Sequence, residues 1–203
     1  MKLLQAGPSP FARKVRVLVR EAGREGEVEI AQVTASPTAP DPTLIAANPL
    51  GKLPALVRED GPTIYDSRVI CRYLDARFDA GLYPEPRLWE VLTLEATADG
   101  IMDAAILMVY EARLREEAMR SEAWVEGQWA RIARAADAAE DLWAGHLAGP
   151  LHMGQIALGC ALGYLDFRMP ERAWREGRPG LAAWFERFAA RPSMAATAPD
   201  LPA

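Results

Sequence analysis

The sequence predicts two domains, a mixed α/β domain followed by a domain built only from helices. Three observations support this prediction. Short β-like runs occur only in the first 78 residues, the segment 79–87 interrupts every periodic pattern, and most of the remaining chain repeats apolar residues at spacings of three and four. We therefore expect an α/β domain at 1–78, a linker at 79–87 and an all-α helical bundle at 88–203.

The first domain begins with a β-α-β unit. Strands are predicted where short apolar and β-branched runs occur, and a helix where Val15, Leu18 and their neighbours recur. The residues 59–61, Glu-Asp-Gly, suit the turn of a hairpin, and the segment 34–42, rich in Pro, Thr and Asp, reads as a loop. The expected elements are strands at 2–6, 28–33, 55–58 and 63–65 and helices around 15–19 and at 67–78.

The second domain is predicted to consist of amphipathic helices. The first of them is long, and we expect a bend near Gly100. From Ser193 onward the pattern fades, which predicts a frayed tail. The expected helices span 88–117, 123–147, 156–167 and 181–190.

The composition excludes several classes of protein. Half of the 203 residues are hydrophobic, which is enough for a sizeable core. The net charge of −5 argues against a partner such as nucleic acid or an anionic membrane. The N-terminal apolar run is too short for a signal peptide, and no stretch approaches the ~18 apolar residues of a membrane span. A cytoplasmic location is therefore expected.

The cysteines and histidines do not suggest a metal site or a disulfide. Cys71 and Cys160 are isolated and lie in apolar helical patterns, so we expect two buried free thiols. His146 and His152 have no neighbouring cluster of ligands, and we predict no metal cofactor. His152 is a poor N-cap for the helix that follows it, although Gln155 can reach back to a backbone N–H.

The stretch 48–67 is the most informative part of the sequence. Pro54 stands directly before an apolar run, where a proline marks a strand start or a tight turn. A cis peptide bond, which is accessible before proline, would turn the N–H and C=O of Leu53 outward, where a peptide backbone could dock. Asp66 or Ser67 would cap the helix that follows, and the N–H groups at such a start suit a carboxylate.

Another helix start lies at Ser9. This residue is well placed as an N-cap, and Pro10 at the first helical position presets φ without removing a needed donor. By itself this pattern is structural. It gains chemical meaning only together with the motifs that follow it along the chain.

Three motifs in order carry a resemblance to a known family. They are SPFARKVR at 9–16, NPLGKLPAL at 48–56 and DSRVI at 66–70. Together they resemble the cytosolic glutathione S-transferases with a serine at the active site, and the match covers almost the whole chain. The resemblance implies a thioredoxin-like first domain, an all-helical second domain, glutathione as co-substrate and no other cofactor.

The resemblance also implies which residues hold glutathione. Leu53 is expected to pair its main chain with the cysteinyl part of glutathione across a cis Pro54, while Asp66 and Ser67 hold the γ-glutamyl end. Lys52 either reaches the glycine carboxylate or is an exposed turn lysine. The predicted glutathione-binding set is Ser9, Phe11, Arg13, Lys52, Leu53, Pro54, Asp66 and Ser67.

The chemistry of this family needs a thiolate, because the thiol is a poor nucleophile. Lowering a thiol pKa from about 8.5 to about 6.5 requires roughly 2.7 kcal/mol. A hydroxyl bound to charged sulfur contributes about 1.5 to 3 kcal/mol and a helix N-terminus about 0.3 to 1. Ser9 at the start of its helix is therefore sufficient, and we predict that it is the catalytic residue. Arg13, the rival, either supplies positive charge or belongs to a solvated face with Lys14, Arg16 and Arg20.

A small hydrophobic electrophile is expected as the second substrate, in a cleft between the domains. Tyr110 either hydrogen-bonds this electrophile or is half-buried packing. The predicted electrophile site consists of Pro8, Phe11, Met102, Ile106 and Tyr110.

The predicted function is a glutathione transferase in detoxification, which conjugates glutathione to the electrophile. The resemblance to the family implies that the protein is a homodimer. Two alternatives stay open: a non-catalytic interaction protein with the same fold, and a glutathione-dependent isomerase or peroxidase. Thiol-disulfide exchange is disfavoured, because Ser9 and Ala12 stand where redox proteins of this fold carry cysteine.

Overall fold

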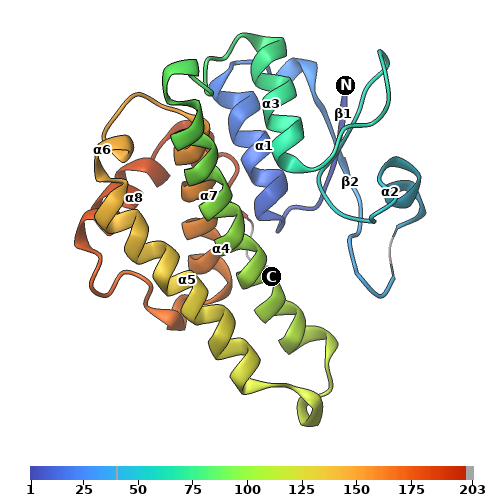
Figure 1. Cartoon of the computed structure of the whole chain (residues 1–203). Helices are drawn as coiled ribbons and strands as arrows, with labels where there is room; N and C mark the ends of the chain where they lie inside the picture. The colour runs from blue at the N-terminus through green and yellow to red at the C-terminus, as the bar shows by residue number, and fades with distance from the viewer. Residues whose placement is uncertain (40, 200–203) are drawn as a thin grey trace. The chain divides into compact units, whose positions relative to one another are not determined.

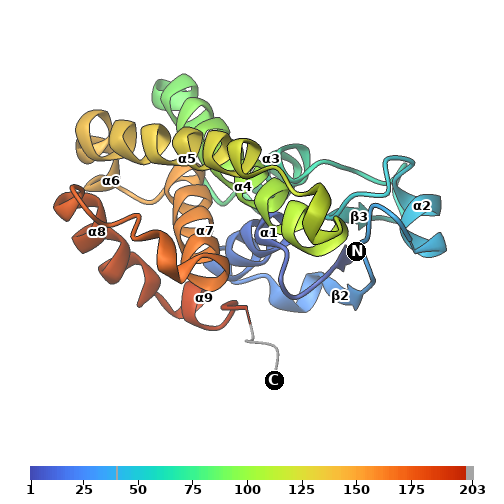
Figure 2. The same ribbon diagram turned by 90° about the horizontal axis from the view of Figure 1, so that it is seen from below.

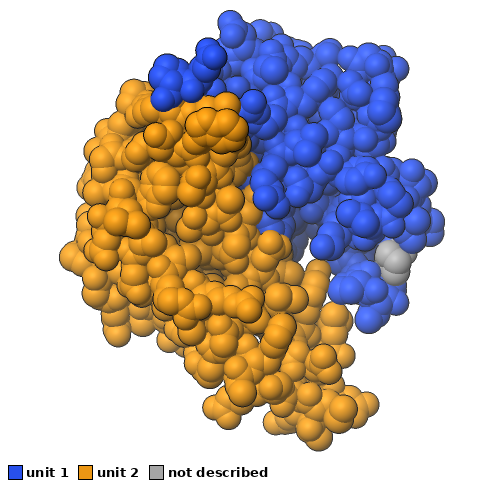
Figure 3. All heavy atoms as spheres, in the orientation of Figure 1, with its two compact units in different colours: residues 1–86, 192–203 blue, residues 87–191 orange. Residues whose placement is uncertain are grey.

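The computed structural model describes residues 1–39 and 41–199, and the chain divides into two compact units, which Figure 3 shows in different colours. Unit 1 contains Met1–Pro86 together with the described residues 192–199, and unit 2 contains Arg87–Arg191. A small mixed sheet with helices forms unit 1, and helices form unit 2, so the predicted fold class is confirmed. The helical domain was expected to span 88–203, but the described residues 192–199 group with unit 1.

Three short strands form the sheet of unit 1, in the order β2-β1-β3 (Figure 1). β1 (Lys2–Gln5) pairs in parallel with β2 (Glu29–Gln32) and antiparallel with β3 (Ala55–Val57). Successive side chains of a strand point to opposite faces of a sheet. Leu3 and Leu4 are both buried, so both faces of the sheet are covered.

Helices cover these two faces. α1 (Pro10–Glu21) packs against α3 (Ser67–Phe78) on one side, and α2 (Pro42–Ala47) lies on the other side (Figure 1). Under α2, Leu4 and Leu44 form a small apolar core with Ala55. The helices on both faces hold the sheet in place, including the edge at which β1 ends.

Two short elements of unit 1 differ from the prediction. α2 begins at the last residue of the segment 34–42, which was expected to be a loop, and continues through residues for which no element was predicted. Its start is marked by Asp41, whose carboxylate accepts an N–H of the first turn at 2.7 Å, and by Pro42 at the first helical position. The predicted strand 63–65 is reduced to a single bridge between Leu56 and Ile64.

Unit 2 is a bundle in which α7 is almost entirely buried. Figure 2 shows α7 between the pair α4 and α5 and the helix α8. At Gly154 the backbones of α7 and α4 approach so closely that an added Cβ would lie 3.0 Å from the Cβ of Leu94. The helices are α4 (Leu88–Leu114), α5 (Glu122–Leu142), α6 (Ala144–Leu147), α7 (Met153–Arg168) and α8 (Pro179–Ala189).

The predicted helix ends shift where local dihedral angles leave the helical region. The helix expected to run to residue 117 ends at Leu114, because Arg115 is extended with ψ 140°. The helix expected at 123–147 is divided in two at Trp143. The helices predicted at 156–167 and 181–190 begin three and two residues earlier. Met153 follows the side-chain cap of His152, and Pro179 occupies the first helical position of α8.

His152 is a better helix cap than the sequence suggests. Its Nδ1 accepts a hydrogen bond from the N–H of Gln155 at 3.4 Å, and the Gln155 Oε1 accepts one from the N–H of His152 at 2.9 Å. This reciprocal pair is a complete capping box at the start of α7. The amide of Gln155 also donates to the carbonyls of His146 and Leu147, both at 3.1 Å. The expected weakness at this position is therefore absent.

Replacing His152 with asparagine is expected to reduce the loss of folding stability that occurs as the pH falls from about 6.5 to 4. Burial lowers the pKa of His152 to about 4, and the charges of Arg87 and His146 act in the same direction. The neutral ring therefore contributes stability that is complete above about pH 6.5 and is lost as the pH falls towards 4, by at most about 3 kcal/mol. Asparagine caps a helix without titrating.

Thermal unfolding of both proteins between pH 7 and pH 4 measures this difference. The asparagine variant should melt at a lower temperature near neutral pH, because the asparagine side chain is smaller than the buried imidazole that it replaces. It should lose less stability when the pH falls. Parallel decline of the two melting temperatures would mean that His152 does not carry the acid sensitivity.

The structure confirms the prediction for the cysteines, since Cys71 and Cys160 are buried free thiols. Among the described residues no group of three or more His, Cys, Asp or Glu side chains is placed to hold a metal ion. In the same part of the chain, no helix is long and apolar enough to span a membrane.

Candidate functional site

Ser9 lies at the turn between β1 and α1. Its backbone is extended, with φ −72° and ψ 117°, and its Oγ accepts a hydrogen bond from the N–H of Ala12 at 3.3 Å. Pro10 occupies the first helical position, as predicted. Because the Oγ acts as acceptor in this bond, the O–H hydrogen is directed elsewhere. Ser9 is partly exposed, so this donor is within reach of a ligand.

The loop before β3 is organised by Asn48. Its side chain donates to the carbonyl of Lys52 at 2.8 Å and accepts from the N–H of Leu50 at 3.0 Å. Gly51 has φ 61°, which favours glycine, and its N–H donates to the carbonyl of Asn48. The Leu53-Pro54 peptide bond that ends this loop is cis. Sequence reasoning missed the role of Asn48, although Asn followed by Pro and Gly is a turn signal.

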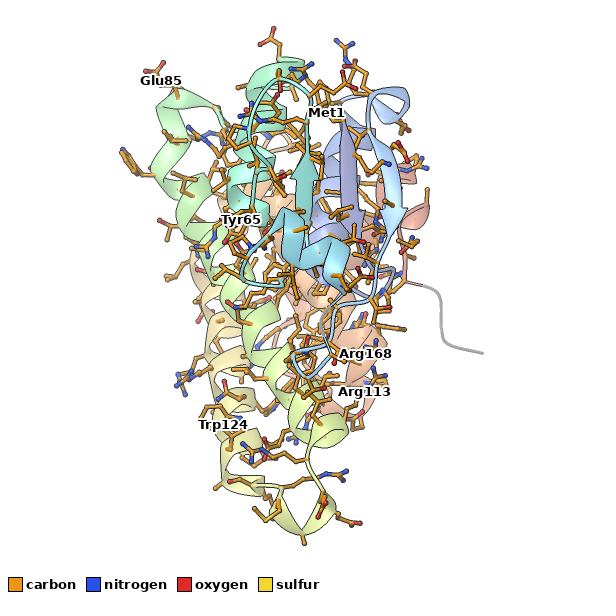
Figure 4. The ribbon with its side chains drawn as sticks, turned by 90° about the vertical axis from the view of Figure 1, so that its right-hand side faces the viewer. Met1, Tyr65, Glu85, Arg113, Trp124 and Arg168 are labelled. Carbon is orange, nitrogen blue, oxygen red and sulfur yellow. The ribbon has the colours of Figure 1, made fainter. Side chains whose placement is uncertain are left out.

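The third segment is the start of α3. Asp66 is the N-cap residue, and its Oδ1 accepts from the N–H of Arg68 at 3.0 Å. The carboxylate is exposed, whereas Ser67 is buried. The peptide bond between Tyr65 and Asp66 is cis, and Figure 4 labels Tyr65 just before the helix.

The topology brings these three segments to one edge of the sheet. β1 ends at this edge and leads to Ser9. β3 runs antiparallel to β1 with Leu4 opposite Ala55, so the residues just before β3, including Leu53, lie at the same edge. Ile64 pairs antiparallel with Leu56, and the chain after it therefore returns towards this edge and reaches Asp66. The same edge therefore gathers three groups: the hydroxyl of Ser9, the main chain of Leu53 and the carboxylate of Asp66 at the start of α3.

Arg13 does not belong to a solvated helix face. It is buried, and its guanidinium donates to the carbonyl of Met194 at 3.0 Å and to the hydroxyl of Thr197 at 3.5 Å. Both acceptors lie at the end of the chain. The interpretation of Arg13 as part of a solvated helix face is therefore wrong. Its predicted role at the glutathione site stays a prediction.

The same contacts overturn the expectation of a frayed tail. Pro192–Ala195 forms the short helix α9, and Ser193, Met194 and Thr197 are buried. The carbonyl of Thr197 also accepts from Arg16 at 3.3 Å. Residues 192–197 are therefore docked on α1 as part of unit 1, and residues 200–203 of the predicted tail lie outside the described residues.

The remaining predicted residues divide by exposure. In unit 1, Lys52 and Pro8 are exposed and Phe11 is partly buried. In unit 2, Ile106 and Tyr110 are partly exposed, whereas Met102 is fully buried and offers no surface to a ligand.

Family models match both units. Residues 8–77 match the N-terminal domain of glutathione S-transferases, and residues 122–187 match the C-terminal domain. A curated relative from Escherichia coli K12, "Uncharacterized GST-like protein YibF", is 36% identical over 204 residues, with 98% of each chain covered.

Solved structures from Pseudomonas fluorescens Pf-5 are similar as well. One glutathione transferase family member with bound glutathione is 44% identical with a TM-score of 0.95, and 98% of each chain is covered. A second structure, with bound S-(propanoic acid)-glutathione, is 42% identical with a TM-score of 0.90, covering 98% of this chain and 100% of the other.

Proposed function

This chain belongs to the glutathione S-transferase family, and we propose that it binds glutathione in unit 1 and transfers the glutathione sulfur to an electrophile. The observation that carries the proposal is the convergence of Ser9, Leu53 and Asp66 at one edge of the sheet. The relative with bound glutathione, 44% identical over nearly the whole chain, supports it.

Each part of glutathione has a matching partner at this edge. The main chain of Leu53, just outside the ladder of β3, suits the peptide groups of the cysteinyl residue. The exposed carboxylate of Asp66 suits the γ-glutamyl ammonium, and the N–H groups at the start of α3 beside Ser67 suit the γ-glutamyl carboxylate. Lys52, which is exposed, supplies a positive charge for the glycine carboxylate.

The proposed reaction depends on Ser9. Its O–H donates to the glutathione sulfur, and this bond together with the N-terminus of α1 stabilises the thiolate. The thiolate attacks an electrophilic carbon, the C–S bond forms, and the leaving group departs with its electron pair. The homodimer, the detoxification role and the cytoplasmic location stay predictions.

Replacing Asp66 with asparagine is expected to weaken glutathione binding about ten- to hundredfold, because a hydrogen bond to a charged group contributes about 1.5 to 3 kcal/mol. Asparagine caps a helix as well as aspartate does, so the melting temperature should hardly change. Titration calorimetry with glutathione measures the effect.

Asp79→Asn is the matched control, since Asp79 is exposed at the other end of α3 and has φ 50°, which asparagine tolerates. Equal affinities of the two variants would remove Asp66 from the site. If the unmodified protein fails to bind millimolar glutathione, the proposed function is wrong and the non-catalytic alternative is favoured.

A further inference from the structure

Unit 2 contains a cavity of about 360 Å³ beside α8. One wall of the cavity is the stretch of chain that connects α6 to α7, and the other wall comes from α8 and the residues directly after it. α6 and α8 contact each other and lie side by side in Figure 1. All the residues that line this cavity belong to unit 2.

Two aromatic rings form the floor of the cavity. Trp184 and Phe188 of α8 are stacked, with their ring centres 4.7 Å apart and an angle of 25° between the ring planes. Both side chains are largely buried, and both line the cavity. A flat apolar group that enters the cavity can therefore pack against aromatic rings that are already ordered.

The connection between α6 and α7 is held in place by hydrogen bonds from inside the protein. The carbonyl of Leu147 accepts one from the indole N–H of Trp184 at 3.0 Å and one from the amide of Gln155 at 3.1 Å. The same amide donates to the carbonyl of Gly149 at 3.3 Å. Because a carbonyl oxygen has two lone pairs, the carbonyl of Leu147 is fully used. The wall is fixed before any ligand binds, and this acceptor is closed to a cationic ligand.

The charged side chains of the cavity are arginines. Arg187 belongs to the last turn of α8, and the guanidinium carbon of Arg191 lies 5.6 Å from the centre of the Phe188 ring. Among the described residues that line the cavity, none is Asp or Glu. Arg187 is exposed, and within residues 1–39 and 41–199 it forms no ion pair. The whole chain has a net charge of −5, so this positively charged cavity differs from the average of the chain.

The helix dipole alone does not explain this grouping of arginines. It favours Arg187, because a cation in the last turn of a helix is stabilised. It disfavours Arg87, which is the N-cap residue of α4, where the dipole is positive. Arg87 nevertheless lies against the same connection, since one of its guanidinium nitrogens is 3.3 Å from the position that a Cβ on Gly149 would occupy. A third positive charge therefore stands beside the wall of the cavity.

We propose that this cavity binds a small anion with a flat apolar body, such as an aromatic sulfonate or carboxylate. The flat body packs against Trp184 and Phe188. The anionic group pairs with Arg187 and Arg191, and Arg87 strengthens the positive potential from outside the cavity. The site uses none of the residues proposed to hold glutathione, so it goes beyond the transferase function and does not depend on it.

Titration calorimetry with naphthalene-2-sulfonate and naphthalene-2-sulfonamide tests this proposal, because the two compounds share the flat body and differ in charge. We expect the sulfonate to bind more tightly, with an affinity that falls when salt is added, whereas the affinity of the neutral sulfonamide should not fall. Arg187→Gln and Arg191→Gln should each weaken sulfonate binding about three- to tenfold and change sulfonamide binding less than twofold.

Arg131→Gln is the matched control and should leave both affinities unchanged, because Arg131 is an exposed arginine of α5 that does not line the cavity. The anion site is wrong if the unmodified protein does not bind millimolar sulfonate, if both cavity variants keep the full sulfonate affinity, or if they weaken both compounds equally. A titration in saturating glutathione recognises binding elsewhere. Loss of sulfonate binding there, with unchanged affinity in the cavity variants, would assign the probe to the glutathione site and would also contradict the proposal.

Discussion

Replacing Ser9 with glycine is expected to lower kcat/KM for glutathione conjugation about ten- to hundredfold. The reason is the loss of one hydrogen bond to a charged sulfur, which contributes about 1.5 to 3 kcal/mol. Glycine is chosen because Ser9 also caps α1 through the N–H of Ala12, and a glycine cap costs only a few tenths of a kcal/mol. The glycine variant therefore removes the hydroxyl needed for catalysis while leaving the stability of α1 almost unchanged.

The pH profile distinguishes thiolate stabilisation from a general defect. In the glycine variant, the pKa of the bound glutathione thiol should rise towards its free value of about 8.5, as followed by the ultraviolet absorbance of the thiolate. Ser9→Thr keeps both the hydroxyl and the cap and should retain the low pKa. An unchanged profile in the glycine variant would assign thiolate stabilisation to another group.

Local signals explain why much of the site was predictable. Ser9 before Pro10 and Asp66 before an apolar helix act as N-caps in the structure, as their sequence patterns predict. Such caps depend on residues within three positions, so the sequence contains all the information they need. The position of Leu53 at the sheet edge follows from the same local logic, because Pro54 marks a strand start.

Long-range contacts explain what was missed. Arg13 and Met194 are separated by 181 positions, and no periodic pattern relates them. On the sequence, Arg13 looks like its exposed neighbour Arg20, because both lie on one basic helix.

Asn48 is an intermediate case. The residues Asn, Pro and Gly signal a turn at 48–51, but they do not show which residues this turn positions. Only the structure shows that the Asn48 side chain holds the carbonyl of Lys52 and so positions the residues before β3. Turn chemistry is local, whereas the element that the turn positions depends on the sheet.

Replacing Arg13 with alanine is expected to destabilise the protein by about 2 to 4 kcal/mol, because the buried guanidinium loses two hydrogen bonds to the docked segment 192–199, one to the carbonyl of Met194 and one to the hydroxyl of Thr197. For a chain of this length, that corresponds to a fall in melting temperature of roughly 5 to 15 °C. Thermal unfolding measures it directly. Arg20→Ala on the same helix is the control, since Arg20 is exposed and forms an ion pair with the exposed Glu25.

The same pair of variants decides between the two roles considered for Arg13. A docking residue should lower stability in the alanine variant but leave the pKa of the bound thiol unchanged at temperatures where the protein is folded. If Arg13→Ala instead melts like Arg20→Ala and raises the thiol pKa, the guanidinium stabilises the thiolate and the docking role is wrong. Stability and thiol ionisation respond to different contacts of one side chain, so measuring both assigns Arg13 without relying on loss of activity alone.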